Sequence, residues 1–191
     1  MVTNLTKKQI ENIQIDESVI FLNYGESDER FLAPTRGGGE FSATVTVRDI
    51  EFDGRHGKTA GTQVIEEQAA SIKVTTLCMS QENLTLAIPS CTISNDGKTI
   101  KNPKTGVVPL ESYLKNITMF AKLIGGKYKK ITIYNPMHET GFTTKAVQKA
   151  EGELGFEFLA HYAHDDLDGD LWEVKEIDQP PTMNATANTP T

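Results

Sequence analysis

The chain has 191 residues, of which 38% are hydrophobic and 24% are charged, and its formal net charge is −7. This size and composition indicate one globular domain, with room for an appended arm or tail. The negative charge argues against a nucleic-acid-binding surface, because such surfaces place Lys and Arg against phosphates. It would suit a surface that must repel DNA.

The cysteines and the lengths of the apolar runs indicate in which compartment the protein is expected. Cys78 and Cys91 are too few for a disulfide scaffold and match no zinc-binding spacing, so we expect free thiols in a reducing cytoplasm. Residues 1–12 lack the apolar core of a signal peptide, and no apolar run approaches the roughly 18 residues of a membrane span. We therefore expect a protein that is made and assembled in the cytoplasm, with no membrane partner.

The first third of the chain predicts an arm, a short strand and a glycine-rich loop. Residues 1–17 are mostly polar and are expected to form an N-terminal arm, and the apolar residues 19–24 predict a strand. Residues 31–39 are predicted to be a loop, which ends in three consecutive glycines that can take positive φ.

Two long strands are predicted next, over 40–52 and 62–78. In the first strand Phe41, Ala43 and Val45 alternate with polar residues, which is the period of a half-buried strand. The second strand alternates in the same way in its later half. We expect the two to pair as a large antiparallel hairpin.

The rest of the chain predicts one helix and several strands. Ser80 is a good N-cap for a helix that Pro89 would stop. Further strands are expected over 112–124, 129–135, 155–162 and 171–177. Residues 141–151 could form a helical turn or an irregular strand, and 178–191 a tail that is flexible or orders on a partner. About seven strands and one helix predict a β-sandwich or a barrel.

No motif for catalysis or cofactor binding stands out. The Gly-Lys-Thr triplets at 57–59 and 97–99 lack the earlier glycine of a phosphate-binding loop, because Phe52 and Thr92 occupy that position. The acidic cluster 161–170 fails the EF-hand spacing and is expected to be a solvated turn, with a casual Ca²⁺ or Mg²⁺ contact as the alternative. A G-x-S-x-G pattern is absent. We expect no enzyme, no cofactor and no metal site.

An ordered set of segments resembles the major tail (tail tube) proteins of tailed bacteriophages of Gram-positive hosts. The stretch Phe31–Phe41, FLAPTRGGGEF, is similar to the first loop of that family. The similarity continues through RDIEFDGR at 48–55, ENLTLA at 82–87, and FEFLAHY followed by LWEV between 156 and 174. It covers residues 18–177, whereas 95–106 look like an added loop and 178–191 an added tail.

The resemblance implies a mainly β fold, a β-sandwich or half-open barrel of the tail tube type with one short flanking helix. It also implies a structural protein of the virion tail whose hexameric rings stack into a tube, with the tape-measure protein and genomic DNA in the lumen. Further partners would be the tail terminator and the baseplate or tip proteins. The alternatives are an inner tube of a contractile tail or secretion-like injection system, and a monomeric carbohydrate-binding β-sandwich with an exposed aromatic platform.

Two sets of site residues follow from this interpretation. The first is a subunit-contact loop, in which the arginine is expected to pair with a carboxylate of a neighbouring subunit: Arg36, Gly37, Gly38 and Gly39. Because this triplet is expected in a loop, Gly38→Val is predicted to hinder assembly more than folding. The second set contains acidic residues expected on strands, whose carboxylates would keep DNA off the lumen wall: Glu40, Glu51, Glu66 and Glu67.

Overall fold

The computed structural model describes residues 4–32, 34–54, 56–144 and 151–182. Its helical elements are α1 (Lys7–Glu11), α2 (Gln81–Leu86) and the 3₁₀ turn η1 (Leu110–Ser112). Its strands are β1 (Gln14–Leu22), β2 (Arg30–Phe31), β3 (Thr35–Asp49), β4 (Gln63–Thr76), β5 (Thr92–Ile93), β6 (Ile100–Lys101), β7 (Asn116–Leu123), β8 (Tyr128–Tyr134), β9 (Met137–His138), β10 (Leu154–Leu159) and β11 (Trp172–Ile177).

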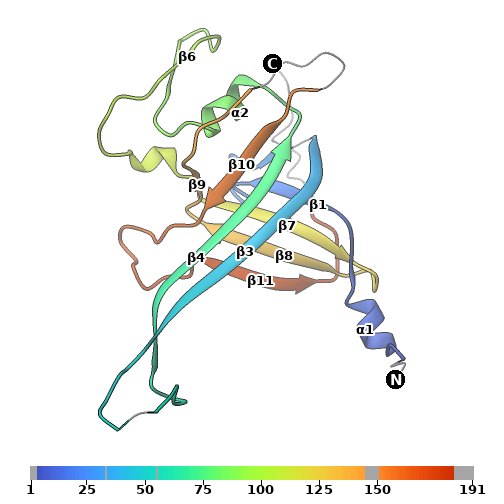
Figure 1. The fold of residues 1–191 in the computed structure, drawn as a ribbon. Coiled ribbons are helices and arrows are strands. Elements are labelled where there is room, and N and C mark those ends of the chain that lie inside the picture. The colour runs from blue at the N-terminus through green and yellow to red at the C-terminus, as the bar shows by residue number, and fades with distance from the viewer. Residues whose placement is uncertain (1–3, 33, 55, 145–150, 183–191) are drawn as a thin grey trace.

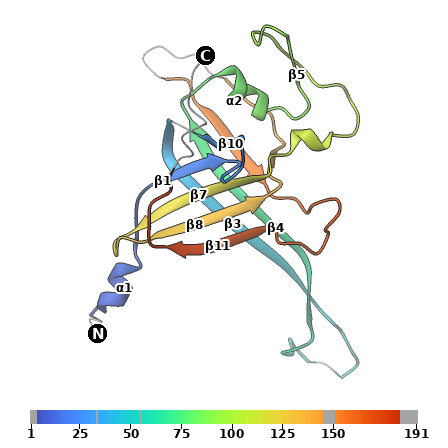
Figure 2. The same cartoon turned by 180° about the vertical axis from the view of Figure 1, so that it is seen from behind.

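The strands form two larger antiparallel sheets and one small one. The first has the order β11-β8-β7-β1-β2, the second the order β3-β4-β10-β9, and β5 pairs only with β6. Figures 1 and 2 show the two larger sheets as crossed layers, with the small sheet at one end. None of these sheets closes among the residues that the structure describes. The expectation of a mainly β fold is therefore confirmed.

The hydrophobic core lies between the two larger sheets. Alternate residues of β1, β7 and β8 point toward the second sheet, among them Ile20, Met119 and Ile133. Ile72 of β4 and Phe158 of β10 meet them from the other side, and all five are nearly inaccessible to solvent. This packing fixes the position of β3 and β4 relative to the rest of the chain.

The predicted long hairpin is confirmed as β3 and β4, which pair antiparallel along almost their whole length. Both strands continue beyond the crossed sheets and project as an arm that ends in the loop 50–62 (Figure 1). The strands predicted over 112–124, 129–135, 155–162 and 171–177 are found as β7, β8, β10 and β11. The period-2 alternation thus located the long strands correctly.

The region before the hairpin differs from the predictions. The glycine triplet is not in a loop, because β3 begins at Thr35 and contains it, and β2 occupies the start of the expected loop. The stretch expected to be an arm contains α1, where Thr6 and Gln9 form a capping box, and the first residues of β1. The helical content therefore exceeds the one flanking helix that was expected.

The helix predicted after Ser80 is confirmed as α2, and the Ser80 side chain accepts a hydrogen bond from the Asn83 amide. Residues 95–106 form most of a lobe around β5 and β6 that stands apart from the two larger sheets (Figure 1). Of the element expected at 141–151, residues 145–150 lie outside the described residues, as do 183–191 of the expected tail.

Candidate functional site

The glycine triplet forms a bulge at the place where the two larger sheets touch. Arg36 lies opposite Thr75 and Gly39 lies opposite Val74, so Gly37 and Gly38 are extra residues in β3. Both have positive φ, +77° and +72°, which favours glycine. The triplet's conformational freedom therefore serves a bulged strand, and the predicted loop at this position is wrong.

Gly39 brings β3 into close contact with β1. Its amide donates a 2.6 Å hydrogen bond to the Ser18 hydroxyl. A Cβ placed on Gly39 would lie 2.8 Å from Cδ1 of Ile20 and 2.8 Å from Sδ of Met119. Since both neighbours are buried in the core, this position belongs to the fold, and the premise behind the Gly38→Val prediction does not hold.

Arg36 has carboxylate partners within its own chain. Its guanidinium nitrogens lie 3.0 Å from Glu151 and 2.6 Å from Glu153, and the arginine is exposed. Hydrogen bonding to Glu151 and then Glu153 raises the pKa of Arg36, and the Arg36 hydrogen bond lowers the pKa of Glu151. The contact ties β3 to the segment before β10. The pairing of Arg36 with a neighbouring subunit stays a prediction.

The outer half of the β3–β4 hairpin is a two-stranded ribbon. Strand β10 pairs with β4 only over residues 71–76, so the residues of β4 before Ser71 have β3 as their single strand partner among the described residues. On one face of this ribbon Val47 lies directly opposite Ile65, and Val45 is next to them on the same face. These three side chains are 49%, 57% and 53% exposed.

The inner half of the hairpin is covered, in contrast to the outer half. Phe41 and Ile72 are paired across the same face, and Ile72 is fully buried in the core. The Phe41 ring also meets the Trp172 ring edge-on at 5.6 Å. The apolar alternation of β3 therefore continues past the point where the second layer ends, which leaves an uncovered apolar face.

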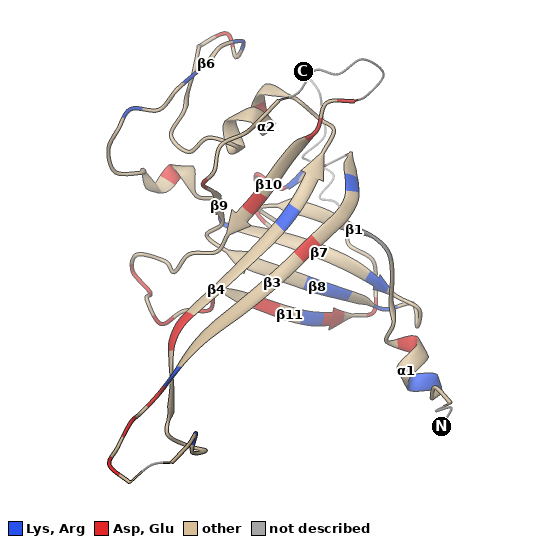
Figure 3. Cartoon of the chain, viewed as in Figure 1, with Lys and Arg blue, Asp and Glu red and all other residues tan. Residues whose placement is uncertain are grey.

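The four predicted lumen acids do not form one group. Glu40 lies opposite Lys73 near the middle of the hairpin, and Glu66 and Glu67 lie on its outer half. Glu66 pairs with Arg48, next to a β-bulge. Glu51 was expected on a strand but lies in the loop after β3, which ends at Asp49. Figure 3 shows the acidic residues of the outer half and of the loop.

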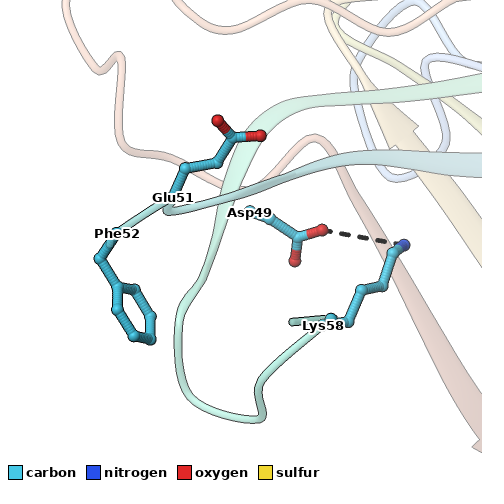
Figure 4. A pocket seen from close by; sticks show the side chains of 5 residues that line it. Asp49, Glu51, Phe52 and Lys58 are labelled. Atoms are coloured by element: carbon cyan, nitrogen blue, oxygen red, sulfur yellow. Dashed lines mark ion pairs between the residues drawn. The ribbon is translucent and has the colours of Figure 1, made fainter. Parts of the chain in front are cut away.

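The loop at the end of the hairpin has a shallow pocket. It is lined by Asp49, Glu51, Phe52, Gly57 and Lys58, and Nζ of Lys58 lies 3.9 Å from Asp49. Figure 4 shows the Phe52 ring turned away from this ion pair, and the ring is about half exposed. Sequence reasoning considered Glu51 and the triplet at 57–59 of this loop, but it did not predict the exposure of the apolar residues Ile50 and Phe52, whose place in a polar turn is the signal of this tip.

Among the described residues, no group of three or more His, Cys, Asp or Glu side chains is placed to hold a metal ion. The acidic segment 161–170 is a turn, closed by a bridge between Ala163 and Asp166. No helix within the described ranges is long and apolar enough to cross a membrane. The projecting hairpin differs from these parts of the described chain in that exposed apolar side chains, Val47 and Ile65, are paired across its two strands.

A scan of the chain against models of known protein families finds no match. A search of curated protein sequences likewise finds no related protein.

Proposed function

We propose that this protein is a structural subunit that assembles with copies of itself into the tail tube of a tailed bacteriophage. The observation that carries the proposal is the projecting two-stranded ribbon with its uncovered Val45, Val47 and Ile65. An isolated two-stranded ribbon is at best marginally stable in water, and an exposed apolar strand face invites a partner. Because residues 18–177 resemble tail tube proteins, we propose that this partner is a further copy of the same chain.

In the assembly we propose, subunits close into hexameric rings of the tail tube type, and the rings stack. The outer strands β3, β9, β2 and β11 leave free edges on both larger sheets, and ring closure would pair such edges. The lumen would hold the tape-measure protein and later the genomic DNA, and the tube would end at the tail terminator and the tip proteins. The net charge of −7 would let DNA slide without binding the wall.

A carbohydrate-binding module receives less support. Such a module needs an exposed aromatic platform, but Trp172 meets the Phe41 ring edge-on and is only 38% exposed. The other exposed aromatic residues come from separate parts of the chain: Phe31, Phe52, Phe142 and Tyr162. A tail tube subunit has no need for such a platform.

Negative-stain electron microscopy and light scattering of the purified protein test the proposal. We expect rings or tubes in the wild type. We expect mostly monomers in the double variant Val47→Asp/Ile65→Asp, because it places charges on the ribbon face while leaving the core intact. The matched control is Leu167→Asp, since Leu167 is 72% exposed on a loop outside the hairpin.

The circular dichroism spectra of all three proteins should agree, which separates assembly from folding. A wild type that stays monomeric at high concentration, even with tail partner proteins present, would refute the proposal. If the double variant assembled at the same concentration as the wild type, the ribbon face would not be a contact between subunits.

A further inference from the structure

The lobe around β5 and β6 has a basic surface on an otherwise acidic protein. Three lysines lie within seven residues of each other, Lys98, Lys101 and Lys104, and all three are exposed. In the part of the chain that the structure describes, no carboxylate pairs with any of them. Most other lysines and arginines of the described chain have an acidic partner, so the lobe presents its charge to solvent.

The one acidic residue of the lobe is engaged in its own turn. The Ser94 hydroxyl donates to Asp96, and the amide of Lys98 donates to the same carboxylate oxygen at 3.1 Å. The Ser94 bond lowers the pKa of Asp96, so that carboxylate stays ionised and bound within the turn. The side-chain amide of Gln81 on α2 donates to the Lys98 carbonyl at 3.2 Å and ties the lobe to that helix. The lysines are thus held on a structured turn.

The outer part of the β3–β4 hairpin, residues 48–67, is net acidic, because it contains five acidic and three basic residues. Glu51 and Asp53 lie in its loop and Glu67 lies on the adjacent ribbon, and all three are exposed. Within the described residues none of these three carboxylates has a basic partner. The tip also exposes apolar residues, Ile50 and Phe52, and the lobe exposes Ile93 and Val107.

The lobe and the tip lie at opposite ends of the molecule and on the same side of its body. Figure 1 shows the lobe at the upper left and the tip at the lower left, and Figure 2 shows the same relation from behind. A copy shifted along the line that joins the tip to the lobe would therefore bring its basic lobe toward the carboxylates at the tip of the next copy. Such a contact is heterologous, and a heterologous contact that does not close repeats indefinitely.

We infer that the lobe of one copy binds the hairpin tip of the next, so that copies stack head to tail. This inference rests on the proposed function, because the contact between lobe and tip would join successive rings. It is additional to the contacts within a ring. Exposed charges act over about 10 Å at moderate salt, so opposite charges steer the ends together and like charges keep wrong ends apart.

Charge reversal of each end tests the inference. The lobe variant is Lys98→Glu/Lys101→Glu/Lys104→Glu, and the tip variant is Glu51→Lys/Asp53→Lys/Glu67→Lys. Each variant alone should form rings but stack only at a concentration roughly tenfold or more above that of the wild type. Because the reversed ends complement each other, mixing preformed rings of the two variants should restore tubes.

The matched control reverses three aspartates of another exposed loop, Asp165, Asp168 and Asp170, to lysine. Its charge change equals that of the tip variant, but rings of this control should not restore tubes when they are mixed with the lobe variant. Tubes of either single variant at the wild-type concentration would overturn the inference, as would equal restoration by the control. Neither of these two results would affect ring formation or the proposed function. A wild type that forms no rings would refute both the stacking contact and the proposed function.

Discussion

Replacement of Gly39 by alanine should destabilise the monomer, although the new side chain is a single methyl group. Its Cβ would lie 2.8 Å from Cδ1 of Ile20 and from Sδ of Met119, where unstrained carbon contacts are about 3.5–4.0 Å. Both neighbours must therefore move by roughly 0.7 Å or more. Ile20 is fully buried and Met119 is 3% exposed, so the ends of both side chains must move within the packed core.

The magnitude follows from two opposing effects. Overpacking of a filled core costs about 1–3 kcal/mol, and Gly39→Ala would also weaken the 2.6 Å hydrogen bond to Ser18 if β3 moved away. Replacing glycine by alanine in a strand otherwise gains about 0.5–1 kcal/mol from the unfolded state. We therefore expect Gly39→Ala to lower the free energy of unfolding by about 1–2 kcal/mol, and Gly39→Val to lower it further.

The control is Gly155→Ala in β10. An added Cβ there meets nothing within 4 Å, and its φ is not in the left-handed region. This variant should be as stable as the wild type or more stable by up to about 1 kcal/mol. Urea unfolding followed by circular dichroism, on protein diluted below its assembly concentration, measures the difference. Equal stability of Gly39→Ala and Gly155→Ala would refute the assignment of the triplet to the contact between the sheets.

Three further predictions concern hydrogen bonds and charge. The buried hydroxyls of Thr118 and Thr132 are 3.0 Å apart, so Thr118→Val should cost about 1–3 kcal/mol in urea unfolding, and adding Thr132→Val should cost less than additivity requires. Since Arg36 lowers the pKa of Glu151, their pairing stabilises the fold above the ordinary glutamate pKa of 4.5 and is lost as the pH falls through the lowered value. The stability difference between wild type and Arg36→Gln should therefore be present at neutral pH and decrease as the pH falls below 4.5 through the lowered pKa of Glu151; a pH-independent difference would contradict the pairing. Asn23 has a φ of +53° and accepts a hydrogen bond from the backbone amide before β7, so Asn23→Ala should lower the thermal midpoint by several degrees, about 2–4 °C per kcal/mol.

The sequence predicts the strands well because alternation is a local property. Residues 40–52 and 62–78 have the period of strands, and their pairing follows from their proximity in the chain. The glycine triplet shows the limit of such reasoning. Positive φ at Gly37 and Gly38 is compatible with a loop or with a bulge, and only the crossing of β1 against β3 decides between them. That crossing joins residues far apart in the sequence.

The candidate site illustrates the same limit. Phe41 and Val47 belong to one alternating series and are indistinguishable by period, yet Phe41 packs against Trp172 whereas Val47 is half exposed. Which part of a strand is covered depends on where the opposing sheet ends, and here Phe41 still meets Trp172 of β11, which is the edge strand of that sheet. Likewise, Arg36 was expected to need a carboxylate, but no local pattern links it to Glu151.

The size of the uncovered face favours a closed assembly over a pair of subunits. Complete burial of a valine or isoleucine gains about 1.5–3 kcal/mol, so covering the exposed halves of Val45, Val47 and Ile65 would gain roughly 2–5 kcal/mol for each copy, and roughly 5–10 kcal/mol if two copies packed these faces together. Association of two proteins costs about 4–15 kcal/mol in lost freedom of motion, and a dissociation constant of about 1 mM already requires a net gain of about 4 kcal/mol. The gain from the ribbon faces therefore only about balances the cost of association, and the faces alone support at most a weak pair. The face becomes effective when a subunit makes several such contacts at once, as in the closed and stacked rings that we propose.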